Sequence, residues 1–147
     1  MYRRMPFHWR GLWNYSNHMN KNFLGIAALL GALSVVLGAF AAHKLRDMLP
    51  PEGVSVFETG TRYQFYHCFA LLIVAILSEK FPGKWIRLSG IFFIAGIILF
   101  CGSLYILTAL RVTETAGATT LVGVITPFGG LCFILGWILL FVAVTRK

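Results

Sequence analysis

The sequence is poor in charged residues, and poorest in acidic ones. Only 12% of its 147 residues are Asp, Glu, Lys or Arg, against about 25% in ordinary soluble domains. Five acidic residues face 13 basic ones, so the formal net charge is +8. This scarcity excludes an ordinary soluble globular domain. With 58% hydrophobic residues and a mean hydropathy of +0.76, the composition instead indicates a small polytopic membrane protein.

Cysteine is scarce too, and motifs that carry enzymatic chemistry are missing. The three cysteines, Cys68, Cys101 and Cys132, are odd in number and widely spaced, which argues against a disulfide framework. Within apolar segments a free thiol is usually a small apolar side chain. No nucleophile, base and orienting group stand at a recognisable spacing, and no Gly-rich run precedes a basic residue in a nucleotide pattern. We therefore expect no catalytic residues, no metal and no cofactor.

Uncharged runs divide the remaining sequence into membrane-crossing segments. They cover residues 22–43, 63–78, 88–110 and 115–145. A membrane helix needs about 20 residues, and the second run is shorter than that. A helix from Phe57 to Ser78, which adds the polar residues before this run, would be about 33 Å long and could cross the membrane. Thr126 and Pro127 resemble a helix cap and first turn, which would leave residues 121–125 as an apolar loop. The predicted fold is an all-α, four-transmembrane-helix antiparallel bundle, residues 23–147, with helices at about 23–43, 57–78, 87–110 and 126–146.

Basic residues are unequally shared between the two sides of this bundle. Nine lie on the side of the termini and the second connection: Arg3, Arg4, Arg10, Lys21, Lys80, Lys84, Arg87, Arg146 and Lys147. Four lie on the other side: Lys44, Arg46, Arg62 and Arg111. Such a bias places both termini in the cytoplasm. We expect a bacterial inner (plasma) membrane, or an organellar membrane in a eukaryote, and no nucleic-acid partner, since membrane topology accounts for the basic charge.

The N-terminal segment, residues 1–22, is basic and aromatic. Its aromatic residues suit a membrane interface: Phe7, Trp9, Trp13 and Tyr15. Translation from Met19 would remove most of it. A signal peptide cleaved at Ala39-Phe40-Ala41 is an alternative, but the apolar stretch exceeds the usual 7 to 15 residues. Cleavage would also discard small residues that let another helix approach.

Polar residues gather where the predicted helices meet the outer side of the membrane. His43 ends the first crossing, residues 63–67 begin the second, Tyr105 lies near the end of the third, and Thr126 begins the fourth. Gln64 and His67 share a helix face, and such groups must face protein or water rather than lipid. We therefore predict an outer-leaflet cluster with an i,i+4 pair of Glu58 and Arg62 at its mouth. The candidate residues are His43, Glu58, Arg62, Tyr63, Gln64, His67, Tyr105 and Thr126.

Four roles are open to this cluster. It can be a hydrogen-bond clamp between helices, because buried polar groups hold membrane bundles together at about 0.6 kcal/mol each. It can bind or conduct a small polar molecule or proton, because histidine has an unperturbed pKa of about 6.5. Metal or haem ligation by His43 and His67 lacks carboxylate or thiolate partners. Hydrolytic catalysis lacks a recognisable constellation.

Several motifs resemble a known family. They are Gly38-Ala-Phe-Ala-Ala-His43, Tyr63-Gln-Phe-Tyr-His67, Gly102-Ser-Leu-Tyr105, and Ile125-Thr-Pro-Phe-Gly-Gly130 with Gly136-Trp137. Together they resemble the domain-of-unknown-function 423 family of small membrane proteins, which includes the bacterial YgdD type and the eukaryotic transmembrane protein 256 type. The resemblance covers nearly all the chain after Met19. It implies a four-helix inner-membrane protein without an assigned activity.

The function predicted from these features is non-catalytic. A short chain with many close-packing glycines leaves much of each helix free for other helices. We expect an accessory or assembly component of a larger membrane system, whose partners are the lipid bilayer and other membrane subunits or copies of itself. The alternative is a small transporter or small-molecule-binding protein that uses the outer cluster.

Overall fold

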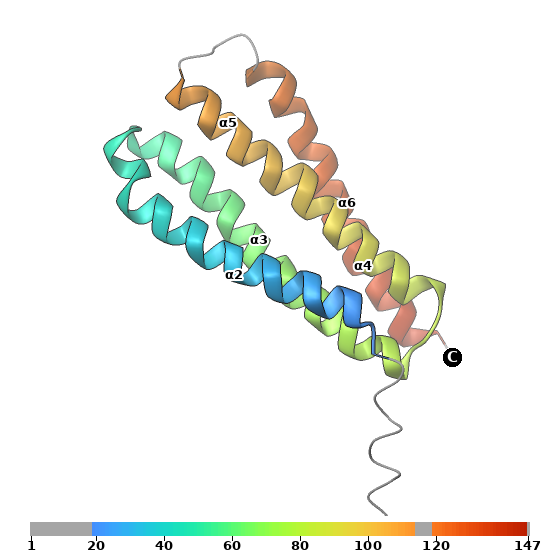
Figure 1. Cartoon of the computed structure of the whole chain (residues 1–147). Coiled ribbons are helices and arrows are strands. Elements are labelled where there is room, and N and C mark those ends of the chain that lie inside the picture. The colour runs from blue at the N-terminus through green and yellow to red at the C-terminus, as the bar shows by residue number, and fades with distance from the viewer. Residues whose placement is uncertain (1–18, 114–118, 147) are drawn as a thin grey trace, which may run out of the picture.

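The computed structural model describes residues 19–113 and 119–146 and contains four antiparallel helical rods (Figure 1). The first rod is α2 (Lys21–His43), followed by the 3-10 turn η2 (Leu45–Asp47), and the second is α3 (Pro51–Lys80). The third joins α4 (Lys84–Gly96), the π-helical η3 (Ile97–Cys101) and α5 (Gly102–Val112). The fourth is α6 (Thr119–Thr145). The predicted all-α, four-helix architecture is confirmed, and the proposed interfacial segment lies almost wholly outside the described residues.

The rods pack in chain order. α3 lies between α2 and the α4–α5 rod, and α6 packs along the other side of α4, η3 and α5. Three rods, α2, α4–α5 and α6, are long and apolar enough to cross a membrane by length and composition. α3 is less apolar, and it contributes much of the core. Core side chains without exposed surface include Leu71, Val74, Ala75, Phe93 and Cys101.

The second helix begins earlier than predicted. It starts at Pro51, six residues before Phe57, because Pro50 is extended and Pro51 takes the first helical position, where a missing N–H costs nothing. The Gly53 amide then donates to the Pro50 carbonyl at 2.9 Å. Two adjacent prolines therefore start this helix rather than prevent it. Its 30 residues extend about 45 Å, which is longer than a hydrocarbon core of about 30 Å.

The fourth helix also begins earlier than predicted. It starts at Thr119 and continues through Pro127, so residues 121–125 are helical rather than a loop. Proline removes one backbone hydrogen bond from a helix. An irregular apolar segment in lipid would leave several backbone groups unbonded, each costing several kcal/mol. Continuing the helix through the proline is therefore the less costly solution.

The two ends of the described chain lie at the same end of the bundle. The Asn20 amide donates to the Ser78 hydroxyl at 3.1 Å, at the end of α3. The Arg146 guanidinium lies 5.0 Å from the Trp85 ring centroid, at the start of α4. The turn between α3 and α4 contains Gly83 with φ 147°, a conformation that glycine tolerates and other residues rarely adopt. The position of both ends of the described chain at one end of the bundle agrees with an even number of membrane crossings.

Glycines allow α6 to lie very close to the third rod. A Cβ atom built at Gly129 would fall 2.3 Å from the backbone nitrogen of Phe100, in the π-helical turn. A Cβ at Gly136 would meet the Phe93 ring at 2.7 Å. Small residues at such contacts let two membrane helices approach closely.

Candidate polar network

Gln64 connects three rods from the middle of α3. Its side chain is only 2% exposed. Its amide nitrogen donates to the Leu30 carbonyl of α2 at 3.0 Å, and its amide oxygen accepts from the Tyr105 hydroxyl of α5 at 3.0 Å. Both ends of the amide are therefore bonded to neighbouring helices, which is the arrangement of a structural clamp.

His67 lies one turn further along α3, within aromatic rings. Its ring stacks on Phe133 of α6 with a centroid distance of 3.5 Å and an interplanar angle of 12°. Tyr63 and Trp137 also lie beside it. The Nδ1 atom is 2.7 Å from the Tyr63 carbonyl oxygen. A carbonyl only accepts, so Nδ1 carries a hydrogen and donates it.

Two further hydrogen bonds join α6 to the third rod. The Ser103 and Thr126 hydroxyl oxygens are 2.7 Å apart, which gives Thr126 a bonding role in place of the predicted helix cap. The Ser89 hydroxyl donates to the Gly136 carbonyl at 2.8 Å. Ser89 was missed by the sequence reasoning, although a hydroxyl within the uncharged run 88–110 was the available signal.

The charged members of the predicted cluster lie elsewhere. Glu58 pairs with Arg46 of η2 at 3.3 Å, so the predicted Glu58–Arg62 pair is wrong. His43 is exposed at the end of α2. It lies 13 residues beyond Leu30, or about 20 Å along the helix axis. His43 is therefore far from Gln64.

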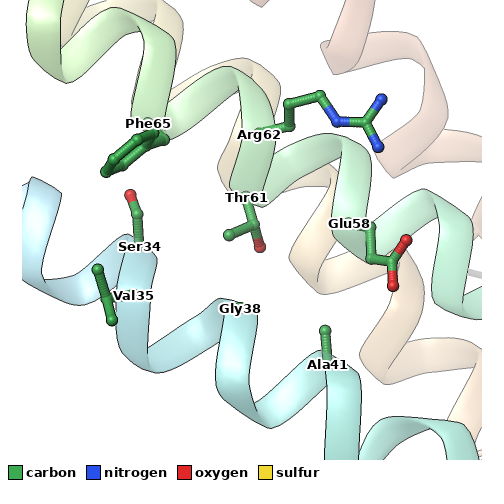
Figure 2. Close-up of a pocket in the computed structure, with 8 residues that line it drawn as sticks. All are labelled: Ser34, Val35, Gly38, Ala41, Glu58, Thr61, Arg62 and Phe65. Atoms are coloured by element: carbon green, nitrogen blue, oxygen red, sulfur yellow. The ribbon is translucent and has the colours of Figure 1, made fainter.

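A cavity opens on the outer surface of the α2–α3 pair, as Figure 2 shows. Its volume is about 390 Å³. Small residues of α2, including Ser34, Gly38 and Ala41, line one side, while Glu58, Thr61 and Arg62 of α3 line the other. Val35 and Phe65 complete the lining. We call this cavity the α2–α3 notch.

The eight predicted residues thus divide into separate groups. Gln64 and Tyr105 form the clamp, Tyr63 and His67 belong to an aromatic cluster, and Thr126 bonds to Ser103. Glu58 and Arg62 line the notch, and His43 stands apart at the end of α2. Within residues 19–113 and 119–146, no group of three or more His, Cys, Asp or Glu residues could hold a metal ion. The three cysteines are free thiols. The hydrogen bonds of Gln64, Tyr105, Thr126 and Ser103 therefore join one helix to another.

The fold and its interhelical hydrogen bonds define a multi-pass membrane protein, and sequence comparisons identify its family. Residues 37–130 match the family model described as "Protein of unknown function (DUF423)". The UPF0382 membrane protein YwdK of Bacillus subtilis (strain 168) is 39% identical over 127 residues, which cover 86% of this chain and 98% of that protein. The UPF0382 inner membrane protein YgdD of Escherichia coli (strain K12) is 34% identical over 129 residues, covering 87% and 93%. No solved structure matches the chain.

The chain therefore belongs to the DUF423, or UPF0382, family of membrane proteins. A UPF0382 membrane protein of Haemophilus influenzae is 42% identical over 120 residues, covering 82% of this chain and 90% of the relative. The family resemblance read from the motifs is confirmed, as is the inner-membrane class.

Proposed function

We propose that this protein is a non-catalytic assembly component of the inner membrane that binds a helix of another membrane subunit through the outward face of α2. Both termini face the cytoplasm in this proposal, because nine of the 13 Lys and Arg residues lie on their side.

The internal hydrogen bonds support a structural role for the polar residues. The Gln64 amide is bonded at both ends, and the Ser89 and Ser103 hydroxyls bond to α6. In the described part of the chain, every fully buried side-chain nitrogen or oxygen has a hydrogen-bond partner. Unsatisfied polar atoms that would point to a bound substrate are thus lacking among these residues.

The observation that carries the proposal is the outward face of α2. Only 17% of its most apolar stretch is buried within the bundle, against 22% for α6 and 39% for the third rod. Gly25, Ala28 and Ala32 are all exposed on this helix, and a Cβ atom at Gly25 would meet nothing within 4 Å. Spacings of three and four place them on one face. Small residues on an exposed membrane-helix face allow a second helix to approach closely.

The test is purification of the tagged full chain from native membranes in a mild detergent, followed by quantitative mass spectrometry. We expect a stoichiometric membrane-protein partner with the wild-type chain, and its loss in the double variant Ala28→Leu/Ala32→Leu. Gly123→Leu on α6 is the matched control, because a Cβ there also meets nothing within 4 Å. A lone chain in mild detergent, or a partner retained equally by both variants, would refute the proposal.

One observation favours transport as the second candidate. Because Nδ1 of His67 donates to the Tyr63 carbonyl, the neutral ring keeps its basic lone pair on Nε2, which is then free to accept a proton. A transport role predicts that His67→Ala abolishes proton flux or uptake in vesicles while the protein stays folded. Tyr66→Phe, which alters an exposed ring on the same helix, is the control. Unchanged flux in His67→Ala removes this candidate.

A further inference from the structure

The α2–α3 notch combines a cavity, an unmatched positive charge and an adjoining apolar surface. Glu58 is already engaged by Arg46. Arg62 is exposed and has no ion-pair partner in the described part of the chain. The carboxylate that lines the notch is therefore already paired, and the Arg62 charge beside it is left for an anionic ligand.

The depth of the notch places this charge near the lipid headgroups. Gly38, which lines the notch on the α2 side, lies five residues before His43 at the end of α2, or about 7.5 Å along the axis. Helical side chains lean toward the helix N-terminus, and the N-terminus of α3 is at the outer end. Figure 2 shows Arg62 extended toward the side where Glu58 lies. The guanidinium thus reaches the interface, where headgroup phosphates lie.

The lower part of the notch suits a hydrocarbon chain. Val35 is 66% exposed and Phe65 is 39% exposed, and both line the cavity on the side away from Glu58. The volume of about 390 Å³ lies within the range of small-ligand sites, which is roughly 300 to 1,000 Å³. A free anion would contact the Arg62 guanidinium but would leave the apolar surface of Val35 and Phe65 uncovered.

We propose that the α2–α3 notch binds one anionic phospholipid, with its phosphate on the Arg62 guanidinium and an acyl chain along Val35 and Phe65. Arginine binds phosphate through two parallel N–H donors, and basic pockets between membrane helices bind lipid headgroups. This inference is independent of the assembly role, because it concerns the lone chain.

Native mass spectrometry of the purified full chain in neutral detergent tests the proposal. The probes are phosphatidylglycerol, phosphatidylcholine with the same acyl chains, and inorganic phosphate. We expect one phosphatidylglycerol to bind more tightly than phosphatidylcholine, and Arg62→Gln to weaken it about tenfold or more, since hydrogen bonds between charged groups are lost. Arg111→Gln is the matched control: Arg111 is an exposed arginine at the same end of the bundle, on α5, outside the notch.

A second variant fills the notch without changing its charge. A Cβ at Gly38 would meet only the Thr61 Cγ2 atom, at an ordinary 3.8 Å, so Gly38→Leu projects into the cavity. We expect it to displace phosphatidylglycerol, whereas Gly25→Leu on the same helix keeps it; thermal melting confirms that each variant is folded. Equal lipid affinity of Arg62→Gln and Arg111→Gln would overturn the proposal. The proposal would also fail if inorganic phosphate bound as tightly as phosphatidylglycerol and displaced it. It would fail as well if Arg62→Gln lost self-association but kept lipid binding, because the occupant of the notch would then be a second copy of the chain.

Discussion

The clamp around Gln64 gives the sharpest test of how the bundle is held together. Tyr105→Phe removes one hydroxyl and leaves the Gln64 amide oxygen without its partner 3.0 Å away. Hydrogen bonds between membrane helices contribute about 0.6 kcal/mol on average and at most about 1.7 kcal/mol. Because Gln64 is 2% exposed, we expect Tyr105→Phe to lie at the upper part of this range. Gln64→Met keeps the side-chain volume but loses the bonds to both α2 and α5, so its cost should be about twice as large.

A double-mutant cycle separates the bond from other effects of the substitutions. The free energy of unfolding is measured in mixed detergent for Tyr105→Phe, Gln64→Met and the double variant. We expect a coupling energy of about 0.6 to 1.7 kcal/mol between the two positions. Tyr66→Phe is the control, because Tyr66 is 56% exposed and should change stability little. A coupling energy near zero, or a cost of Tyr105→Phe equal to that of Tyr66→Phe, would refute the clamp.

Five further substitutions test the helix packing, a turn, an interhelical hydrogen bond and the ion pair through the same unfolding measurement. Gly129→Ala should destabilise by about 1 to 3 kcal/mol, because its Cβ would strike the Phe100 backbone. At the neighbouring Gly130 a Cβ would meet only the Phe100 ring, at an ordinary 3.9 Å, so Gly130→Ala should be neutral or slightly stabilising. Equal effects would contradict the close approach. Gly83→Ala should cost about 1 to 3 kcal/mol because φ is 147° in the turn before α4; a neutral result would mean that the turn adopts another conformation. Ser89→Ala should cost about 0.6 to 1.7 kcal/mol through the lost bond to α6, and no cost would show that this bond does not hold α6. Arg46→Gln should change stability by less than about 1 kcal/mol, since its pair is exposed, and a larger loss would indicate a buried role.

The membrane fold was predictable because charge in this sequence is confined to a few short stretches. Uncharged runs locate the four rods, and the asymmetry of Lys and Arg predicts their direction. Helix ends were less predictable. Proline often marks the start or the end of a helix, yet Pro51 starts α3 while Pro127 lies inside α6. Only the packing around each proline decides which of these positions it takes.

The errors in the site follow from those helix ends. With a start at Phe57, His67 would lie 10 residues, or about 15 Å, along the helix. With the observed start at Pro51, it lies 16 residues, or about 24 Å, along the helix. Gln64 and His67 are therefore near the middle of the bundle, while His43 remains at its outer end. The partner of Glu58 was not predictable either, because Arg46 approaches it through the turn η2 rather than along one helix.

Accessibility labelling distinguishes this divided arrangement from a single outer pocket most directly. The three native cysteines are replaced by alanine, and single cysteines are then introduced as His43→Cys, Gln64→Cys and His67→Cys. Each variant is treated with a membrane-impermeant maleimide, first folded in sealed vesicles and then after solubilisation in denaturant. We predict rapid labelling at position 43 from the side opposite the termini, and labelling at positions 64 and 67 only after denaturation. Comparable labelling of all three positions in the folded protein would contradict an internal clamp and restore a continuous polar pocket.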